Sequence, residues 1–157
     1  MPRCPRAAPR LPEEPPLASI DDALRIAIRV HAGAVDKAGQ PYILHPLRVM
    51  ARLSTDTERV VAILHDVVED GDVTLDDLRA EGFSDEVVDA IDHVTRRAGE
   101  SYEAFIERIA PHPLARRVKL ADLADNMDVT RLVVLDERGM ERMQRYLRSW
   151  QRLRAAE

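Results

Sequence analysis

Apolar residues recur at helical spacing along most of the chain, and no window shows the sustained alternation of a β-strand. The first such segment follows Ser19, a favourable N-cap, and places Ala23, Ile26 and Val30 on one face. This segment brings His31 to its C-terminal end. The pattern predicts a bundle of helices joined by short loops.

The next elements are marked by glycine, proline and capping residues. A loop with two glycines is expected at 32–42, and a second helix near His45 and Pro46, because proline is favoured in the first turn of a helix. A third helix is predicted over 57–69, where Gly71 stops it. Further helix starts are expected at three capping residues, Thr74, Ser84 and Ser101.

The C-terminal third of the chain predicts two more helices. One is expected over 113–132, directly after a turn bracketed by Pro111 and Pro113. The other lies within 136–154 and carries an apolar face that could close the core or pair with a second chain in a homo-oligomer, formed by Met143, Leu147 and Trp150. The expected fold class is therefore all-α.

Length and composition suggest one domain with an N-terminal tail. The 157 residues suffice for a single core, and six of the ten prolines lie in the first 16 residues. We therefore expect 1–17 to be a disordered Pro/Arg-rich tail and 18–157 to form the domain, with an Arg-rich C-terminal helix. No apolar run reaches the ~18 residues of a membrane helix or forms a secretory signal, which predicts a cytoplasmic protein without membrane contact.

The charge distribution limits the partners. The net charge is −5, but residues 1–17 and 136–157 carry +1 and +2, so the middle carries −8. Phosphates would then need a metal ion or a few placed cations. The six aromatic residues are too few for an aromatic platform that binds DNA or RNA. The single cysteine, Cys4, cannot form a cysteine cluster, so any metal must be held by nitrogen and oxygen.

The strongest local signal is the acidic end of the apolar helix at 57–69. His65 and Asp66 are followed by Glu69 and Asp70, and in a continuous helix Glu69 shares the face of the first two. Carboxylates at a helix C-terminus oppose the helix dipole unless a cation is present. A bound divalent ion would remove this conflict. The alternative is an exposed helix end whose carboxylates are only solvated.

A second acidic element lies at 119–128. It places Asp122 and Asn126 one helical turn apart, with Lys119 a turn earlier. Apolar neighbours on this helix put Asp122 close to the boundary of the core, and acids are rarely buried without a partner. The segment therefore offers a second candidate carboxylate for a metal or a polar site.

The histidines add weight to the metal hypothesis. His31, His45 and His65 each lie at a predicted helix end within the first 65 residues. A lone histidine in such a place is more often a cap or a packed residue than a ligand, but the three occur together in a chain that has no cysteine cluster. His93 and His112 are expected to be surface residues.

Four motifs in order resemble a known family. They are VH at 30–31, KAGQPYILHP at 37–46, HDVVED at 65–70 and KLADLADNMD at 119–128. Together they resemble the hydrolase domain of RelA/SpoT-type proteins, and most closely the stand-alone small alarmone hydrolases of the HD superfamily. The resemblance implies an HD-domain helical bundle that binds one manganese ion through four residues, His31, His65, Asp66 and Asp122.

The resemblance also implies an activity. Family members remove the 3′-pyrophosphate of (p)ppGpp, the alarmone of the stringent response, and release GDP or GTP and pyrophosphate. Glu69 and Asp70 match the catalytic acid pair, and the substrate-facing positions are Lys37, Tyr42, His45 and Asn126. Nitrogen and oxygen ligands suit manganese, with iron or zinc as alternatives, and such an ion activates a bound water near neutral pH.

The chain departs from the family pattern at Asp36, Ala38, Leu123 and Asp128. Asp36 stands where the family carries a cation that stacks on the purine, and Leu123 and Asp128 replace basic residues. Another phosphorylated nucleotide or cofactor, such as pppApp or NADPH, is therefore an alternative substrate, and a non-catalytic nucleotide-binding module is an alternative of a different class. Arginines at other positions could compensate, namely Arg25, Arg29, Arg48 and Arg131.

Overall fold

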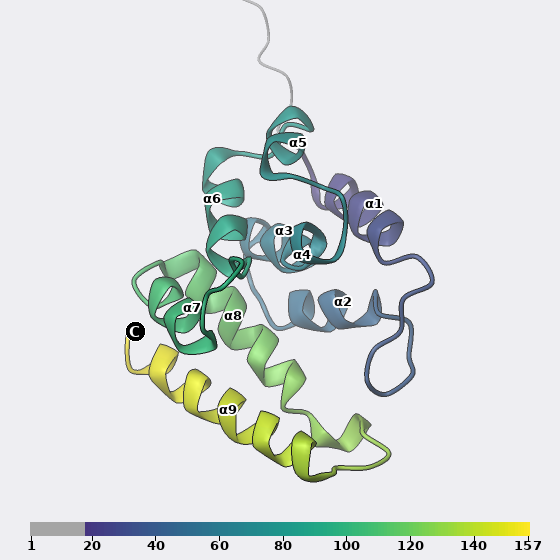
Figure 1. The fold of residues 1–157 in the computed structure, drawn as a ribbon. Coiled ribbons are helices and arrows are strands. Elements are labelled where there is room, and N and C mark those ends of the chain that lie inside the picture. The colour runs from purple at the N-terminus through teal and green to yellow at the C-terminus, as the bar shows by residue number, and fades with distance from the viewer. Residues whose placement is uncertain (1–17) are drawn as a thin grey trace, which may run out of the picture.

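The computed structural model describes residues 18–157, and this part of the chain is helical, with one isolated β-bridge between Val35 and Pro41. The expected all-α architecture is confirmed (Figure 1). The predicted tail, 1–17, lies outside the described residues. The elements are α1 (Ile20–Val30), α2 (Leu44–Ala51), α3 (Asp56–Leu64), α4 (Val67–Asp70), α5 (Leu75–Ala80), α6 (Asp85–Val94), α7 (Tyr102–Ile109), α8 (Pro113–Asn126), the 3₁₀ turn η1 (Val129–Arg131) and α9 (Glu137–Arg154).

Short polar side chains set where the helices begin. Ser19 and Thr74 form capping boxes at α1 and α5, in which the cap accepts from a backbone N–H and an aspartate three residues on accepts from the cap. Ser84 and Ser101 cap α6 and α7 in the simpler way. These four predicted helix starts are confirmed.

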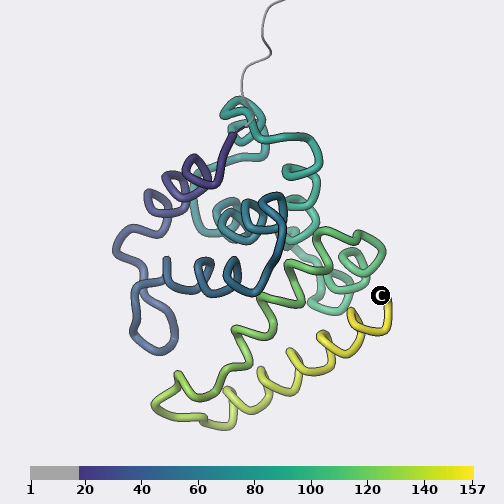
Figure 2. Tube along the Cα trace, turned by 180° about the vertical axis from the view of Figure 1, so that it is seen from behind, coloured from purple at the N-terminus to yellow at the C-terminus, as the bar shows by residue number. Residues whose placement is uncertain are grey.

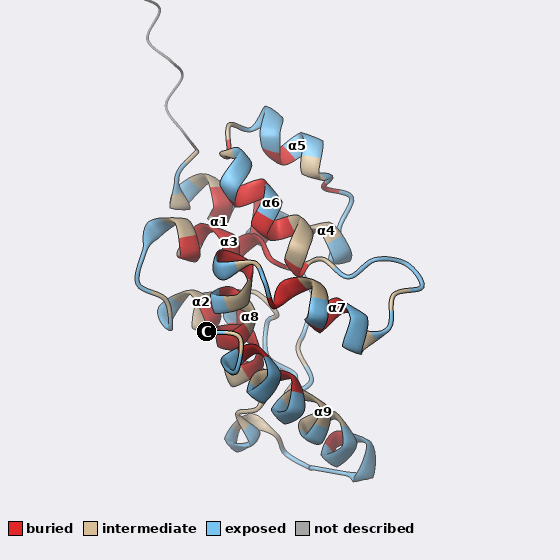
Figure 3. Cartoon of the chain, turned by 90° about the vertical axis from the view of Figure 1, so that its left-hand side faces the viewer, coloured by how far each residue is buried: buried red, intermediate tan, exposed pale blue. Residues whose placement is uncertain are grey.

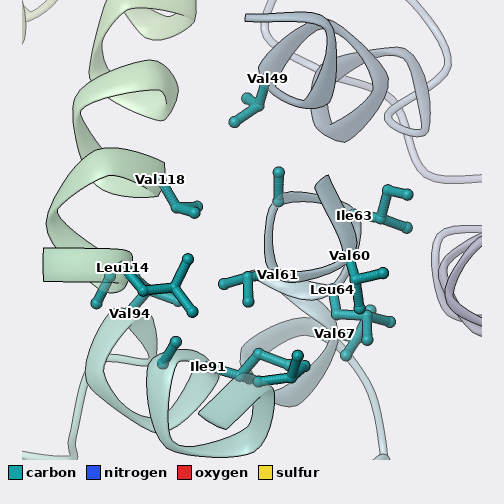
Figure 4. Packing of buried hydrophobic residues seen from close by; sticks show 14 of the residues in the cluster. Val49, Val60, Val61, Ile63, Leu64, Val67, Ile91, Val94, Leu114 and Val118 are labelled. Atoms are coloured by element: carbon teal, nitrogen blue, oxygen red, sulfur yellow. The ribbon is translucent and has the colours of Figure 1, made fainter. Parts of the chain in front are cut away.

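Helix α3 lies at the centre of the fold. All five residues from 60 to 64 are at most 5% exposed, so its C-terminal half is covered on every side. Figure 1 shows α3 among α1, α2, α6 and α8, and Figure 4 shows Val61 facing Ile91 of α6 and Leu114 and Val118 of α8. The chain leaving α3 at His65 is therefore already inside the molecule.

The predicted continuous helix over 57–69 is wrong, because the chain breaks at His65 and Asp66. Asp66 has φ −105° and ψ −5°, and α4 starts anew after it. In a continuous helix the carbonyl of Ala62 would accept the amide of Asp66. Here this carbonyl is hydrogen-bonded to the His65 ring instead, with Nδ1 2.7 Å away. Gly71 ends α4 as expected, and a Cβ there would lie 2.8 Å from Val30 Cγ1, so glycine permits close packing on α1.

The predicted helix over 113–132 is also too long, because α8 ends at Asn126. Asp128 leaves the helical conformation, and its carboxylate accepts the amide of Thr130, which starts the separate turn η1. The loop at 31–43 and the η1 segment consequently approach each other below α2 and α8 (Figures 1 and 2). Arg131 of η1 reaches Asp36 of the loop there.

Helix α9 packs along α8 and also contacts α7 (Figure 2). Tyr146 and Trp150 pack against the core, and Leu153 is fully buried. The packing face of α9 therefore follows i, i+4 and i+7 spacing. The predicted packing face was partly wrong, because Leu147 is 47% exposed. Figure 3 shows buried residues gathered around α3, with exposed surface on the outer side of α9. No helix within 18–157 is both long and apolar enough to span a bilayer.

Candidate metal centre

His65 stands at the junction of α3 and α4 with one ring nitrogen anchored. Its Nδ1 is 2.7 Å from the Ala62 carbonyl, which only accepts, so Nδ1 carries the proton of the neutral ring. The lone pair then lies on Nε2, a buried atom without a hydrogen-bond partner. Nε2 is 2.9 Å from Asp66 Oδ2. A lone pair and a carboxylate oxygen this close together are suited to binding the same cation.

Asp122, from the C-terminal half of α8, completes the acidic side of this cluster. It is 3% exposed, and its Oδ1 lies 3.7 Å from His65 Nε2. Lys119 Nζ is 2.7 Å from the other oxygen, and Asn126 donates its side-chain N–H to Oδ1. Burial opposes the charge, but Lys119 together with His45 and His65 holds the pKa of Asp122 well below its usual value.

His45 lies within the same cluster. Its Nδ1 is 2.8 Å from Asp125 Oδ2, which favours the proton on Nδ1 and leaves Nε2 3.1 Å from Asp122 Oδ1. His45, His65 and Asp122 each offer a ligand atom within 4.8 Å of the others. Burial opposes the charged ring, but hydrogen bonds with Asp122 and Asp125 raise the pKa of His45. The substrate contact implied for His45 stays a prediction, and its position also suits a ligand.

His31 lies beside this cluster. It caps α1, is 4% exposed, and has a buried Nε2 without a hydrogen-bond partner. Within residues 18–157 no ion pair of 4.0 Å or less joins it to Asp66 or Asp122, whereas Asp70 Oδ2 is 3.8 Å from its Nδ1. The Tyr42 ring lies 4.8 Å from the His31 ring, and its hydroxyl donates to Asp66 Oδ2 at 2.6 Å. Tyr42 therefore connects His31 to the cluster.

Glu69 and Asp70 point in different directions. Because the chain breaks before α4, the spacing of one continuous helix does not relate Glu69 to His65, and Glu69 Oε1 accepts the backbone N–H of Arg96 at 2.5 Å. Asp70 faces His31. Burial and the charge of Asp66 raise the pKa of Asp70, and burial is also the main cause of the raised pKa of Glu69. The roles implied for both carboxylates stay predictions.

The donor set fits a divalent ion. His31 and His65 each have a buried Nε2 that no hydrogen bond satisfies, an arrangement that is costly unless a cation or water takes the lone pair. Asp66 and Asp122 lie next to the His65 ring and are ionised, with the pKa of Asp66 lowered by His65 to about 2 although burial opposes this. Imidazole and carboxylate together suit manganese, iron or zinc. The predicted ligand set of His31, His65, Asp66 and Asp122 stays a prediction.

A cavity of about 340 Å³ opens onto the cluster. The predicted substrate-facing residues Lys37, Tyr42, His45 and Asn126 all line it. Residues of α9 were not predicted there, yet the cavity is also lined by Arg142, Met143 and Tyr146. Their i, i+1 and i+4 spacing marks one side of a helix, but only the contact between α9 and α8 shows that this side meets the cavity.

A second group of histidines lies between α6 and the start of α8. His93 and His112 were expected on the surface, but their side chains are 25% and 18% exposed and the ring centroids are 4.4 Å apart. His112 Nδ1 accepts the amide of Ala115 as the cap of α8, and Nε2 is 2.9 Å from Asp89 Oδ2. Both nitrogens of His112 are therefore used in hydrogen bonds that stabilise the helix start.

Comparisons with known proteins agree with this architecture. The HD domain family profile matches residues 23–118. A probable GTP pyrophosphokinase of Mycobacterium leprae is 36% identical over 130 residues, which cover 74% of this chain and 16% of that protein. A guanosine-3′,5′-bis(diphosphate) 3′-pyrophosphohydrolase of Aquifex aeolicus is 33% identical over 120 residues, which cover 69% of this chain and 17% of that protein. The chain thus spans about one sixth of the length of these relatives.

A solved structure, reported as a metazoan ortholog of SpoT that hydrolyzes ppGpp and plays a role in starvation responses, has the same fold. The TM-score is 0.74 at 23% identity, and the match covers 92% of this chain and 90% of that one. The family profile covers more than half of this chain and spans α3, α4 and the His65–Asp66 junction. The chain therefore belongs to the HD domain family.

Proposed function

We propose that this chain is a metal-dependent phosphohydrolase that removes the 3′-pyrophosphate of (p)ppGpp and releases GDP or GTP. The observation that carries the proposal is the pair of buried imidazole nitrogens, on His31 and His65, left without hydrogen-bond partners, together with the ionised carboxylates beside His65 that line a cavity, Asp66 and Asp122. The name of the Aquifex aeolicus relative supports the choice of substrate. We propose one Mn²⁺ ion, with Fe²⁺ or Zn²⁺ as alternatives.

A divalent ion bound here would lower the pKa of a bound water and hold a phosphoryl oxygen. The chain's own residues orient the carboxylates. Asn126 and Lys119 bind Asp122 from two sides, and the Tyr42 hydroxyl donates to Asp66. Because these partners are themselves half-buried or buried, the acidic groups keep one geometry without reorganisation.

Of the two candidate acid-base residues, Asp70 is better placed to accept the proton of the attacking water. The pKa of both carboxylates is raised, mainly by burial, but Asp70 lies beside His31 at the edge of the cluster. Glu69 is held by the Arg96 amide. We propose that Glu69 positions the 95–101 loop and that Asp70 handles the proton.

The test is pyrophosphate release from ppGpp with and without added Mn²⁺. We expect release only with metal and at least ~100-fold slower release in Asp66→Asn, since even outer partners of metal ligands contribute 10- to 100-fold. Asp76→Asn is the matched control, because this carboxylate is 92% exposed on α5. Asp70→Asn should lower kcat more than Glu69→Gln does.

The alternatives give different results in the same assay. A panel of ppGpp, pppApp and NADPH separates substrates that share the metal chemistry. Tight binding of ppGpp by the metal-loaded protein without any cleavage would replace the hydrolase with a nucleotide-binding module. Release that is equally fast in Asp66→Asn would exclude the proposed centre.

A further inference from the structure

Asp36 introduces a negative charge into a cavity that is proposed to receive an anionic substrate. The structure shows how that charge is neutralised. Asp36 Oδ1 accepts the amides of Ala38 and Gln40 at 2.9 and 3.0 Å, which fixes the turn of the loop. Its Oδ2 lies 3.2 Å from Arg131 Nη1 and 3.6 Å from Arg48 Nη2. The carboxylate is therefore a partner of two arginines.

Arg131 is held at its other side by Asp125. Its Nη2 donates to the Asp125 carbonyl at 2.8 Å and lies 3.3 Å from the carboxylate, while Arg48 Nε donates to the same carboxylate at 2.8 Å. Two guanidinium groups and two carboxylates thus offset one another and join the loop, α2, α8 and η1. Asp128 Oδ2 lies 3.8 Å from Arg131 Nε as a further carboxylate, and His45 Nδ1 is a further partner of Asp125. Asp128 caps η1 and fixes the backbone of this turn. Arg131 consequently has one position and no excess charge.

The rest of the cavity has the opposite character. Lys37 and Arg142 line it, and within residues 18–157 neither has a carboxylate oxygen within 4.0 Å. Burial and the neighbouring cations Arg142 and Arg145 lower the pKa of Lys37, as expected for positive groups that lack a counter-charge. Arg131, in contrast, is paired with carboxylates, and apolar Val35 and Leu132 line the same cavity.

This division separates two kinds of ligand chemistry. Phosphates bind unpaired cations, whereas a planar, charge-neutralised guanidinium among apolar side chains suits the face of an aromatic base. We propose that Arg131 is the residue on which the purine base of the nucleotide stacks, and that Lys37 and Arg142 bind its phosphates. The inference rests on the proposed function for the nucleotide, but not on hydrolysis.

The arrangement also predicts weak discrimination between purines. The Nη groups of Arg131 already donate to Asp36 and Asp125, so few donors are left to recognise the edge of a base. Stacking alone tolerates any base because each has a π face. We therefore expect GDP and ADP to bind with similar affinity.

The experiment measures binding of GDP, ADP and inorganic pyrophosphate to the full chain by calorimetry. Arg131→Lys keeps the charge beside Asp36 and Asp125 but has no plane, so we expect about tenfold weaker GDP and ADP binding, the effect of losing one base stack, and unchanged pyrophosphate binding. Arg131→Ala should weaken GDP and ADP binding at least as much, and because it also leaves Asp36 less neutralised, pyrophosphate binding is compared in the lysine variant. Arg152→Ala is the matched control, since this arginine lies on α9 and pairs with exposed Glu107 of α7.

The outcomes test the proposed base site independently of the proposed hydrolysis. If pyrophosphate binding falls as much as GDP binding, Arg131 is a phosphate contact and the inference is wrong. The inference is also wrong if GDP binding is unchanged in both variants, or if Arg131→Lys binds GDP as tightly as the wild type. A wild-type chain that binds pyrophosphate but no nucleotide would contradict it as well. A chain that shows the expected binding pattern yet never cleaves ppGpp retains the base site and loses only the proposed reaction.

Discussion

Two groups of histidine and aspartate in this protein have the same composition and opposite hydrogen bonding. His45, His65 and Asp122 form one, and Asp89, His93 and His112 form the other, each with ligand atoms within 4.8 Å. In the first group Nδ1 is anchored by a backbone carbonyl or a carboxylate, and each Nε2 faces acidic oxygen. In the second, His112 Nδ1 caps α8 and its Nε2 donates to Asp89.

The difference shows that spacing alone does not define a metal site. Imidazole binds a metal through a lone pair, and a hydrogen bond on the other nitrogen decides where that lone pair lies. The lone pair of His65 lies on Nε2 in the buried interior without a hydrogen bond, whereas the lone pair of His112 on Nδ1 accepts the amide N–H of Ala115. Burial adds to the contrast, because the side chain of Asp122 is 4% exposed and that of Asp89 is 61% exposed. The first group therefore supports the proposed metal centre around His65 and Asp122, and the hydrogen bonds of the second indicate a structural role.

The largest expected effect is on metal affinity. His65→Gln removes the buried lone pair and should weaken Mn²⁺ binding by at least ~100-fold, beyond what loss of an outer partner causes. His112→Gln should leave the affinity unchanged. Competition with a fluorescent chelator measures both. An equal loss in the two variants would mean that the second group also holds the ion.

Sequence reasoning predicted the fold well where local signals exist. Ser19, Thr74, Ser84 and Ser101 begin helices as expected, because a capping side chain acts within three residues of its own position. The break at His65 had no such signal. ILHDVVED contains neither glycine nor proline, and the helix is interrupted because the His65 ring takes the carbonyl of Ala62.

For the site, residue types could be predicted and partners could not. The candidate residues around His65 and Asp122 were identified from motifs, and the cavity positions of Lys37 and Asn126 agree with that expectation. The approach of Arg131 to Asp36 spans 95 positions in sequence. It depends on where α8 ends and how η1 turns, and no local pattern encodes such a contact. The same holds for Arg142 of α9.

A second prediction concerns thermal stability. A ligand that binds only the folded state at 100 times its Kd adds about 2.7 kcal/mol, which corresponds to about 5 to 10 °C for a chain of this size. Saturating Mn²⁺ should therefore raise Tm by that amount relative to the EDTA-treated protein. Differential scanning calorimetry should find the same increase in His93→Gln. An Asp122→Asn variant that still shows the full increase would contradict the assignment.

The structural role of the second group predicts a smaller effect. His112→Ala removes the N-cap of α8 and should lower the free energy of unfolding by about 1 kcal/mol, the usual value of a cap. His112→Asn should retain most of the stability, because asparagine also caps well. Urea unfolding at fixed metal concentration measures the difference. Equal losses in both variants would show that the contact with Asp89, rather than the cap, is what stabilises this region.

The smallest expected effect tests the charged surroundings of that second group. Arg108 donates to the carbonyls of Asp92, His93 and Thr95 at the end of α6 and pairs with Glu100 at 2.8 Å. The hydrogen bond from Arg108, with further help from Arg97, lowers the pKa of Glu100 from 4.5 to about 2.

Because the folded pKa of Glu100 is depressed, its contribution to stability is present above the unfolded value and is lost as the pH falls toward about 2. Glu100→Gln should therefore destabilise the protein by at most about 1 kcal/mol near neutral pH, since glutamine keeps the size and one acceptor oxygen of the side chain and loses only its charge. The difference from wild type should shrink as the pH falls below about 4.5. Urea midpoints of both proteins, measured between about pH 6 and pH 3, give this difference. A gap that stays constant over this range would mean that the shape of the side chain, and not its charge, supports the end of α6.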